Sequence, residues 1–124
     1  MKKSGILNTD LAAIVAGLGH GDLLVIGDAG LPVSQGVPCI DLAVTLGVPQ
    51  MLDVLDAVLS EMCVETAFRA EEAAEIGTQI DTRIACELVT HDVFKERSAS
   101  AVAVVRTGEG TPYANVGLIA GVVF

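Results

Sequence analysis

The stretch "LGHGDLLVIGDAGLP", residues 18–32, decides which fold class the sequence favours. Its centre, residues 23–26, is a short and continuous apolar run, which is typical of a strand covered on both faces. A loop rich in glycine and proline follows at Asp28. Strands covered on both faces occur mainly in α/β proteins, in which helices pack on either side of a mostly parallel sheet.

Segments with helical and strand periodicity alternate along the rest of the chain. Helices are predicted after the capping residue Asn8, over residues 49–59 and after His91. Further strands are predicted over residues 40–44, 62–68, 84–89 and 116–124. Residues 102–105 fit either a helix or a strand, and residues 71–82 show no clear pattern. We therefore expect one three-layer α/β domain over residues 1–124, with a mostly parallel sheet flanked by helices.

Composition limits both the partners and the assembly of the chain. Hydrophobic residues make up 52% of the 124 residues and the mean hydropathy is +0.61. No apolar run approaches the ~20 residues that a membrane span requires, so no membrane partner is expected. We expect the surplus apolar surface to be buried between the subunits of a homo-oligomer. The net charge of −9 disfavours nucleic acid and strongly anionic substrates, and leaves neutral or cationic small molecules.

The cysteines and the N-terminus indicate a compartment. Cys39, Cys63 and Cys86 are odd in number, widely spaced and without a C-x-x-C motif, which predicts three buried free thiols. No apolar segment of the signal-peptide type follows Met1. Both features favour a cytoplasmic location.

Two polar residues flank the apolar run and are candidates for chemistry. His20 lies between two glycines, so it could simply end the preceding helix, or it could transfer protons where a substrate can approach closely. In the second case an acceptor must fix its tautomer, and Asp22 or Asp28 could supply it. Asp28 could equally cap its own loop as an Asx-turn. Because Asp28 and His91 both follow predicted strands, a ligand site is expected at this end of the sheet.

The polar loop over residues 106–115 contains the only tyrosine. Tyr113 and Asn115 offer directional hydrogen bonds beside Pro112, which suits a rigid binding loop, although an ordinary turn explains the same pattern. His91 could likewise be an ordinary residue at a helix N-terminus. No metal site is expected, because the histidines and acidic residues lack short ligand spacing. The Gly-x-Gly sequences follow a helix instead of a strand, so no phosphate-binding fingerprint is present.

Several stretches together resemble one family. They are "LGHGDLLVIGDAGLPV" (18–33), "IDLAVTLGVPQ" (40–50), Thr90-His91 followed by Phe94-Lys95, "GEGTPYANV" (108–116) and the ending "AGVVF" (120–124). In this order, and from Lys3 to Phe124, they are similar to the D-ribose pyranase family. A related fucose-mutarotase branch typically reads Asp-Ala-Asn-Phe-Pro where this chain has Gly30-Leu31, so the ribose branch is favoured. The segment between Glu72 and Thr90 looks shorter than in the family, which indicates a trimmed helix.

The resemblance implies a cofactor-free isomerase that interconverts the pyranose and furanose forms of β-D-ribose. It also implies a ribose-pyranase-like fold and a cytoplasmic homo-oligomer, commonly a decamer of two pentamers with sites between adjacent subunits. His20 would be the catalytic acid/base. The sugar would be held by Asp28, His91, Tyr113 and Asn115, with Ala114 contributing its backbone.

The chemistry of these residues agrees with the resemblance. Opening a sugar hemiacetal needs an acid/base group that titrates near pH 7 and donors that hold an uncharged polyol, with no metal and no redox group. Two other hypotheses stay open. One is a mutarotase for fucose or another sugar, and the other is a non-catalytic sugar-binding accessory subunit of ribose uptake, which would not need a titrating His20.

Overall fold

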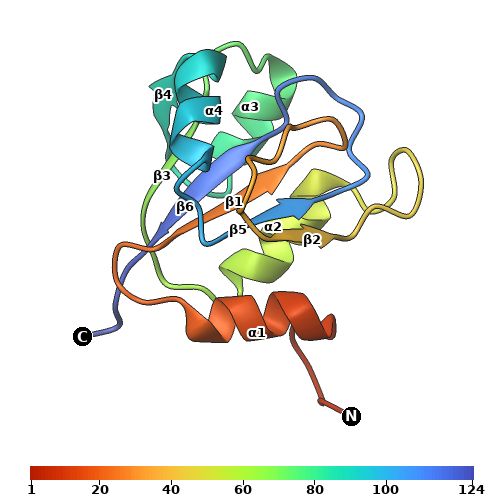
Figure 1. The fold of residues 1–124 in the computed structure, drawn as a ribbon, viewed down its shortest axis with the longest axis vertical. Coiled ribbons are helices and arrows are strands. Elements are labelled where there is room, and N and C mark those ends of the chain that lie inside the picture. Colours follow the sequence, from red (N-terminus) through yellow and green to blue (C-terminus); the bar gives the residue numbers. More distant parts are fainter.

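The apolar run after His20 forms strand β1 (Leu23–Gly27), whose five residues are all buried. The structure is a computed structural model that describes residues 1–124. The other strands are β2 (Cys39–Asp41), β3 (Val64–Ala70), β4 (Glu87–Val89), β5 (Ala103–Arg106) and β6 (Val116–Ala120). The helices are α1 (Thr9–Gly17), α2 (Met51–Leu59), α3 (Glu75–Asp81) and α4 (His91–Ser98). All six strands form one sheet in the order β2-β5-β1-β6-β3-β4 (Figure 1).

The sheet is mostly parallel, and one strand runs against the others. β1 pairs in parallel with β5, β2 with β5, and β3 with β4. β6 is antiparallel to both of its neighbours, β1 and β3, so β1 and β3 run in the same direction. The carboxyl ends of five strands and the start of β6 therefore meet at one edge of the sheet, which we call the carboxyl edge. The mostly parallel α/β sheet predicted from the sequence is confirmed.

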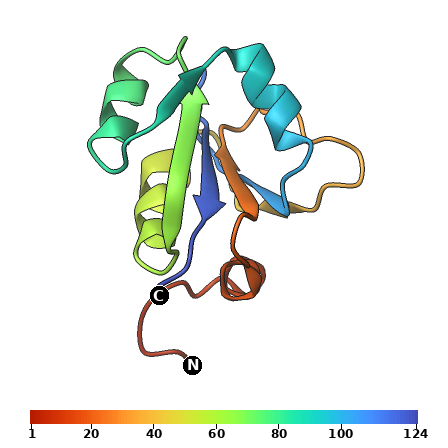
Figure 2. The same ribbon diagram turned by 90° about the vertical axis from the view of Figure 1, so that its left-hand side faces the viewer.

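Helices cover both faces of the sheet and make the three layers. Figure 2 shows α2 and α3 on one face, α4 on the other, and α1 across the end opposite the carboxyl edge. The larger core cluster of 20 residues lies under the first face and includes Leu55 and Ile80. The smaller cluster of 8 residues lies under α4, where the rings of Phe68 and Phe94 pack with centroids 5.2 Å apart. Burial on both faces explains why β1 contains no polar residue.

Local signals place several elements correctly. The Asn8 side chain accepts a hydrogen bond from the Leu11 backbone N–H at 2.9 Å and begins α1, and α2 occupies residues 51–59 as predicted. α4 ends at Ser98, and the ambiguous run 102–105 belongs to β5. Three predicted strands are shorter than expected: the structure has Cys39–Asp41 in place of 40–44, Glu87–Val89 in place of 84–89, and Val116–Ala120 in place of 116–124.

The segment without a clear pattern contains α3, which a half-buried ion pair holds against the sheet. Arg69 on β3 donates from Nε and Nη2 to both carboxylate oxygens of Asp81, at 2.8 and 2.6 Å. Gly77 leaves room for this guanidinium, since a Cβ there would lie 2.6 Å from Nη1. This contact joins β3 to α3, and the periodicity of the sequence cannot predict it because the two residues are 12 positions apart. Hydrogen bonds from Arg69 lower the pKa of Asp81 below its ordinary value.

We expect Asp81→Asn to lower the free energy of unfolding at pH 7 by about 1–2 kcal/mol, less than for a fully buried pair because the Asp81 side chain is 42% exposed. Because the folded-state pKa of Asp81 is depressed, its stabilisation is present above the unfolded pKa, near 4, and is lost as the pH falls through the folded value. Urea unfolding at pH 7 and below pH 3 should therefore show a difference only at pH 7. Glu96→Gln, at an exposed carboxyl, is the matched control. Equal stability of wild type and Asp81→Asn at pH 7 would contradict this role.

The prediction that the cysteines are buried is wrong for two of them. Cys39 and Cys63 are exposed and Cys86 is half-buried, and all three thiols are free. β2 is an edge strand with only Ile40 facing inward, and Cys63 lies directly before β3, so their apolar neighbours in sequence do not cover them. Burial raises the pKa of the Cys86 thiol to about 11. No helix combines the length and apolar character needed to span a membrane.

Candidate functional site

Asp28 leaves β1 at the carboxyl edge and is tied to the polar loop before β6. Its backbone N–H donates to the Asn115 Oδ1 at 2.8 Å. Its own Oδ1 accepts from the Gly30 N–H at 2.9 Å, the Asx-turn considered from the sequence. This turn uses one carboxylate oxygen and leaves Oδ2 available at the rim of the site.

The Tyr113–Asn115 turn has an unusual backbone. Tyr113 has a φ of +62°, a left-handed conformation that is uncommon for residues other than glycine and that concentrates at functional sites. The Tyr113 carbonyl accepts from the Asn115 N–H at 2.8 Å. Ala114 and Asn115 are fully buried, whereas Tyr113 is 37% exposed. The turn thus buries the Asn115 side-chain amide and leaves Tyr113 partly exposed to solvent.

His91 begins α4 and reaches the same place from β4. The Thr90 hydroxyl accepts from the Val93 N–H at 3.2 Å, so Thr90 caps the helix. The His91 ring packs edge-on against Tyr113, with centroids 5.0 Å apart and planes at 78°. Asp28, His91, Tyr113, Ala114 and Asn115 therefore gather at one edge of the sheet, and we call them the carboxyl-edge cluster.

Two acidic residues, Glu72 and Glu109, hold the backbone around this cluster, and the sequence analysis did not identify them as site residues. The Glu72 carboxylate accepts from the His91 backbone N–H at 2.9 and 3.0 Å. Glu109 accepts from the backbone N–H groups of Met51 and Thr111, at 3.2 and 3.1 Å. Burial alone raises the pKa of Glu109, but these hydrogen bonds and one from the Thr111 hydroxyl outweigh it and hold the pKa below its ordinary value. Glu72 pairs with an atom 19 residues away, so no local pattern reveals its role.

Two buried nitrogens of the cluster have no hydrogen-bond partner. They are His91 Nδ1 and Asn115 Nδ2. Leaving a buried polar atom unpaired costs about 1–3 kcal/mol, so such atoms are rare in folded proteins and require an explanation. Asn115 Nδ2 is an amide nitrogen, which can only donate, and His91 Nδ1 is a ring nitrogen, which can donate or accept. A ligand with hydroxyl groups can satisfy both.

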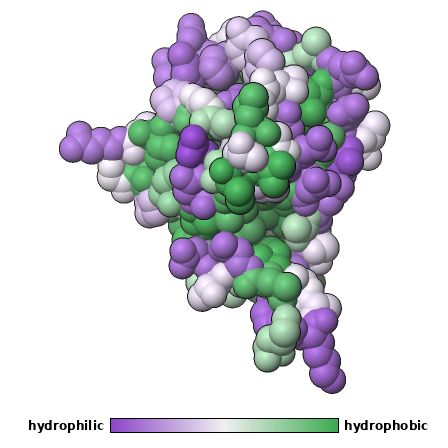
Figure 3. Space-filling view, turned by 90° about the vertical axis from the view of Figure 1, so that its right-hand side faces the viewer, coloured by the Kyte–Doolittle hydropathy of each residue, from purple (hydrophilic) through white to green (hydrophobic).

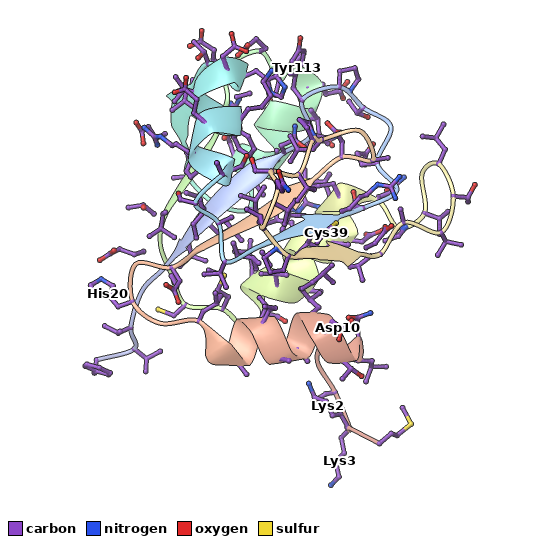
Figure 4. All side chains as sticks on the ribbon, viewed as in Figure 1. Lys2, Lys3, Asp10, His20, Cys39 and Tyr113 are labelled. Atoms are coloured by element: carbon purple, nitrogen blue, oxygen red, sulfur yellow. The ribbon has the colours of Figure 1, made fainter.

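His20 lies at the opposite end of β1 from this cluster. β1 alone spans about 17 Å at about 3.3 Å per residue, and Figure 4 shows His20 at the left side of the molecule, apart from Tyr113 at the top. The His20 side chain is 59% exposed, and its Nε2 lies 3.2 and 3.3 Å from the two carboxylate oxygens of Glu65. Neither aspartate considered from the sequence contacts the ring, because Asp22 accepts from the Gly19 N–H at 2.8 Å and Asp28 is at the far edge. Within one chain, His20 and the cluster cannot contact one pentose.

No surface hollow of the chain is lined by both His20 and residues of the carboxyl-edge cluster. The largest, about 590 Å³, lies over the α4 face and contains none of the six predicted site residues; its lining includes Asp22, Phe68 and Arg97. A hollow of about 340 Å³ lies beside the cluster, between Glu72 and Tyr113. No three histidine, cysteine or acidic side chains converge where they could hold a metal ion.

Comparison with known proteins identifies the family. The model of the RbsD / FucU transport protein family matches residues 1–123. The chain belongs to the RbsD/FucU family. Curated relatives within the family include the D-ribose pyranases of Bacillus mycoides and Bacillus anthracis, each 50% identical over an alignment of 131 positions that covers both chains completely. This chain has 124 residues, so seven of the aligned positions have no counterpart in it.

Solved structures from the RbsD/FucU family share the fold. The structure of Bacillus subtilis RbsD complexed with D-ribose is 45% identical, with a TM-score of 0.95 over 100% of both chains. The fucose mutarotase of Streptococcus pneumoniae in complex with L-fucose is 26% identical, with a TM-score of 0.82 over 95% of both chains. The family thus includes proteins solved with a neutral monosaccharide, and the ribose complex is the more similar of these two.

Proposed function

We propose that this chain is a D-ribose pyranase, a single-domain isomerase that interconverts the pyranose and furanose forms of D-ribose without a cofactor. The observation that supports this most strongly is the pair of unpartnered buried nitrogens, His91 Nδ1 and Asn115 Nδ2, in the cluster that also contains Asp28. An uncharged polyol offers hydroxyls that both donate and accept, which suits this mixed set. The curated relatives with 50% identity over the full chain support the same substrate and reaction.

The carboxyl-edge cluster holds the sugar in this proposal. Asn115 Nδ2 donates to one hydroxyl, Asp28 Oδ2 accepts from another, and the Tyr113 phenol and His91 Nδ1 complete the set. Ala114 contributes its backbone. Because Asn115 is buried and bonded to the Asp28 backbone, the donor and the acceptor are fixed relative to each other before the sugar arrives.

His20 moves the protons. Ring opening removes the proton of the anomeric hydroxyl, breaks the bond between C1 and the ring oxygen, and returns a proton to that oxygen, leaving an open-chain aldehyde. Closure reverses these transfers with a different hydroxyl attacking C1, and no net proton is gained or lost. An imidazole nitrogen with a lone pair can accept a proton and later donate it, so His20 can take and return the proton. The flanking glycines leave its ring exposed to a substrate.

The separation of His20 from the cluster supports an assembly in which adjacent copies share each site. One copy contributes the carboxyl-edge cluster and a neighbour contributes His20, in a homo-oligomer that the family resemblance suggests is a decamer of two pentamers. Exposed apolar side chains in the loop between β2 and α2 fit such packing, since Val44 and Leu46 are 80% and 76% exposed. Figure 3 shows apolar surface at the centre of the face on which this loop protrudes. We also propose a cytoplasmic location.

Asp28→Asn should weaken ribose binding about tenfold while the protein stays folded. The amide oxygen can still accept from the Gly30 N–H, so the turn is kept, but the charged acceptor for a sugar hydroxyl is lost. Titration calorimetry with ribose and circular dichroism measure the two effects. Loss of folding with unchanged affinity in the residual native protein would assign Asp28 to structure alone.

Ring-form exchange measured by NMR saturation transfer tests the proposed function. The wild-type protein should accelerate exchange between the pyranose and furanose of ribose, and should act on ribose more strongly than on fucose in the same panel of sugars. Stronger acceleration with fucose would favour a mutarotase of the other branch. Ribose binding without any acceleration would favour the sugar-binding accessory subunit, which matches the description of the family as transport proteins.

A further inference from the structure

We infer that Glu65 is a positioning residue for His20: its carboxylate holds the imidazole with the proton on Nε2 and turns Nδ1 towards the sugar. This inference rests on the proposed function of His20. The observation is the contact of Nε2 with both carboxylate oxygens of Glu65, at 3.2 and 3.3 Å. No other side chain forms a hydrogen bond or an ion pair with the His20 ring.

Glu65 lies at an irregularity of the β3 backbone that determines where its side chain points. In the pairing of β3 with β6, Val64 is opposite Ala120 and Thr66 is opposite Ile119, so Glu65 is the additional residue of a β-bulge. Bulges redirect a side chain and are frequent beside active sites. Here the bulge lies where the end of β6 approaches β3.

The end of β6 also leaves room for Glu65. A Cβ on Gly121 would lie 3.1 Å from the Glu65 Cβ, so a larger residue there would crowd the acidic side chain. The Gly21 N–H donates to the Ala120 carbonyl at 2.8 Å, which fixes the residue after His20 to the same strand end. Both partners are therefore anchored to β6, although they are 45 residues apart in the sequence.

The chemistry of the pair determines which nitrogen acts. A carboxylate has no proton to donate, so a hydrogen bond to Nε2 requires the proton on that nitrogen. In the neutral ring the lone pair is then on Nδ1, and this is the atom that accepts the proton of the anomeric hydroxyl. When Nδ1 is protonated, the carboxylate lies beside the cationic ring and stabilises it, as an orienting acid does for a catalytic histidine.

A set of variants tests the inference. Glu65→Ala should lower kcat for ribose exchange by roughly tenfold to a hundredfold, with KM and ribose affinity within about twofold of wild type, because Glu65 acts through His20 and not on the bound sugar. Glu65→Gln, whose amide oxygen can still accept from Nε2–H, should retain more of kcat than Glu65→Ala. Added formate should partly restore kcat in Glu65→Ala and have no effect on the wild type. Glu96→Ala, at an exposed carboxylate of α4, is the matched control and should leave kcat unchanged.

The double variant His20→Ala/Glu65→Ala separates positioning from a general structural role. Because Glu65 acts only through the ring, the double variant should have the same kcat for ribose exchange as His20→Ala alone. Wild-type kcat in Glu65→Ala, an equal fall in the Glu96→Ala control, or 15N spectra with the proton of the neutral His20 ring on Nδ1 would each overturn the inference. If His20→Ala itself retains full exchange, the proposed role of His20 fails instead, and the two failures are thus distinguishable.

Discussion

His20→Ala is expected to reduce ribose ring exchange by about a hundredfold or more, down to the rate in buffer, because general acid–base catalysis contributes roughly 10²–10⁴-fold. Ribose binding should persist, since the carboxyl-edge cluster is at the other end of β1. Folding should also persist, because the side chain is 59% exposed and its only partner is Glu65.

NMR saturation transfer on ribose measures the exchange rate, and titration calorimetry measures the affinity. Light scattering on the variant shows whether its assembly is that of the wild type. Lys3→Ala, at another exposed basic residue near the N-terminus, serves as the control and should exchange ribose at the wild-type rate. Unchanged exchange in His20→Ala would remove this residue from the reaction.

Elements whose signal is local could be predicted from the sequence. The apolar run of β1 and the regular spacing of Leu55 and Val58 in α2 identify their structures without any knowledge of neighbours. The helix α3 could not be predicted, because Arg69 on β3 and Asp81 hold it in place. Tertiary contacts of this kind override weak local preferences.

The same distinction applies to the candidate site. The rule that ligands bind beyond the carboxyl ends of strands predicted that Asp28 and His91 lie together, and the structure places them at one edge. The distance between His20 and Asp28 also follows from the sequence, since the two residues flank one strand and must lie at its two ends. Glu65 and Glu72 could not be found, because their partners are 45 and 19 residues away along the chain.

Two inactive variants should restore activity when they assemble together. His20→Ala lacks the proton-transfer group. Asp28→Asn/His91→Ala lacks two of the four side chains that hold the sugar, but keeps the Asx-turn and the backbone N–H that residue 91 donates to Glu72. If each site combines His20 of one copy with the cluster of its neighbour, a mixed oligomer contains some sites in which both halves are wild type. Random mixing of equal amounts gives about one such site in four.

The most direct test of the shared site is therefore ribose exchange by the mixed oligomer, co-expressed with two different tags and purified through both. We predict about a quarter of the wild-type rate per site, against buffer rates for each variant alone. Co-purified mixed oligomers that exchange ribose no faster than the separate variants would contradict the account, because a site formed within one chain could not be restored by mixing.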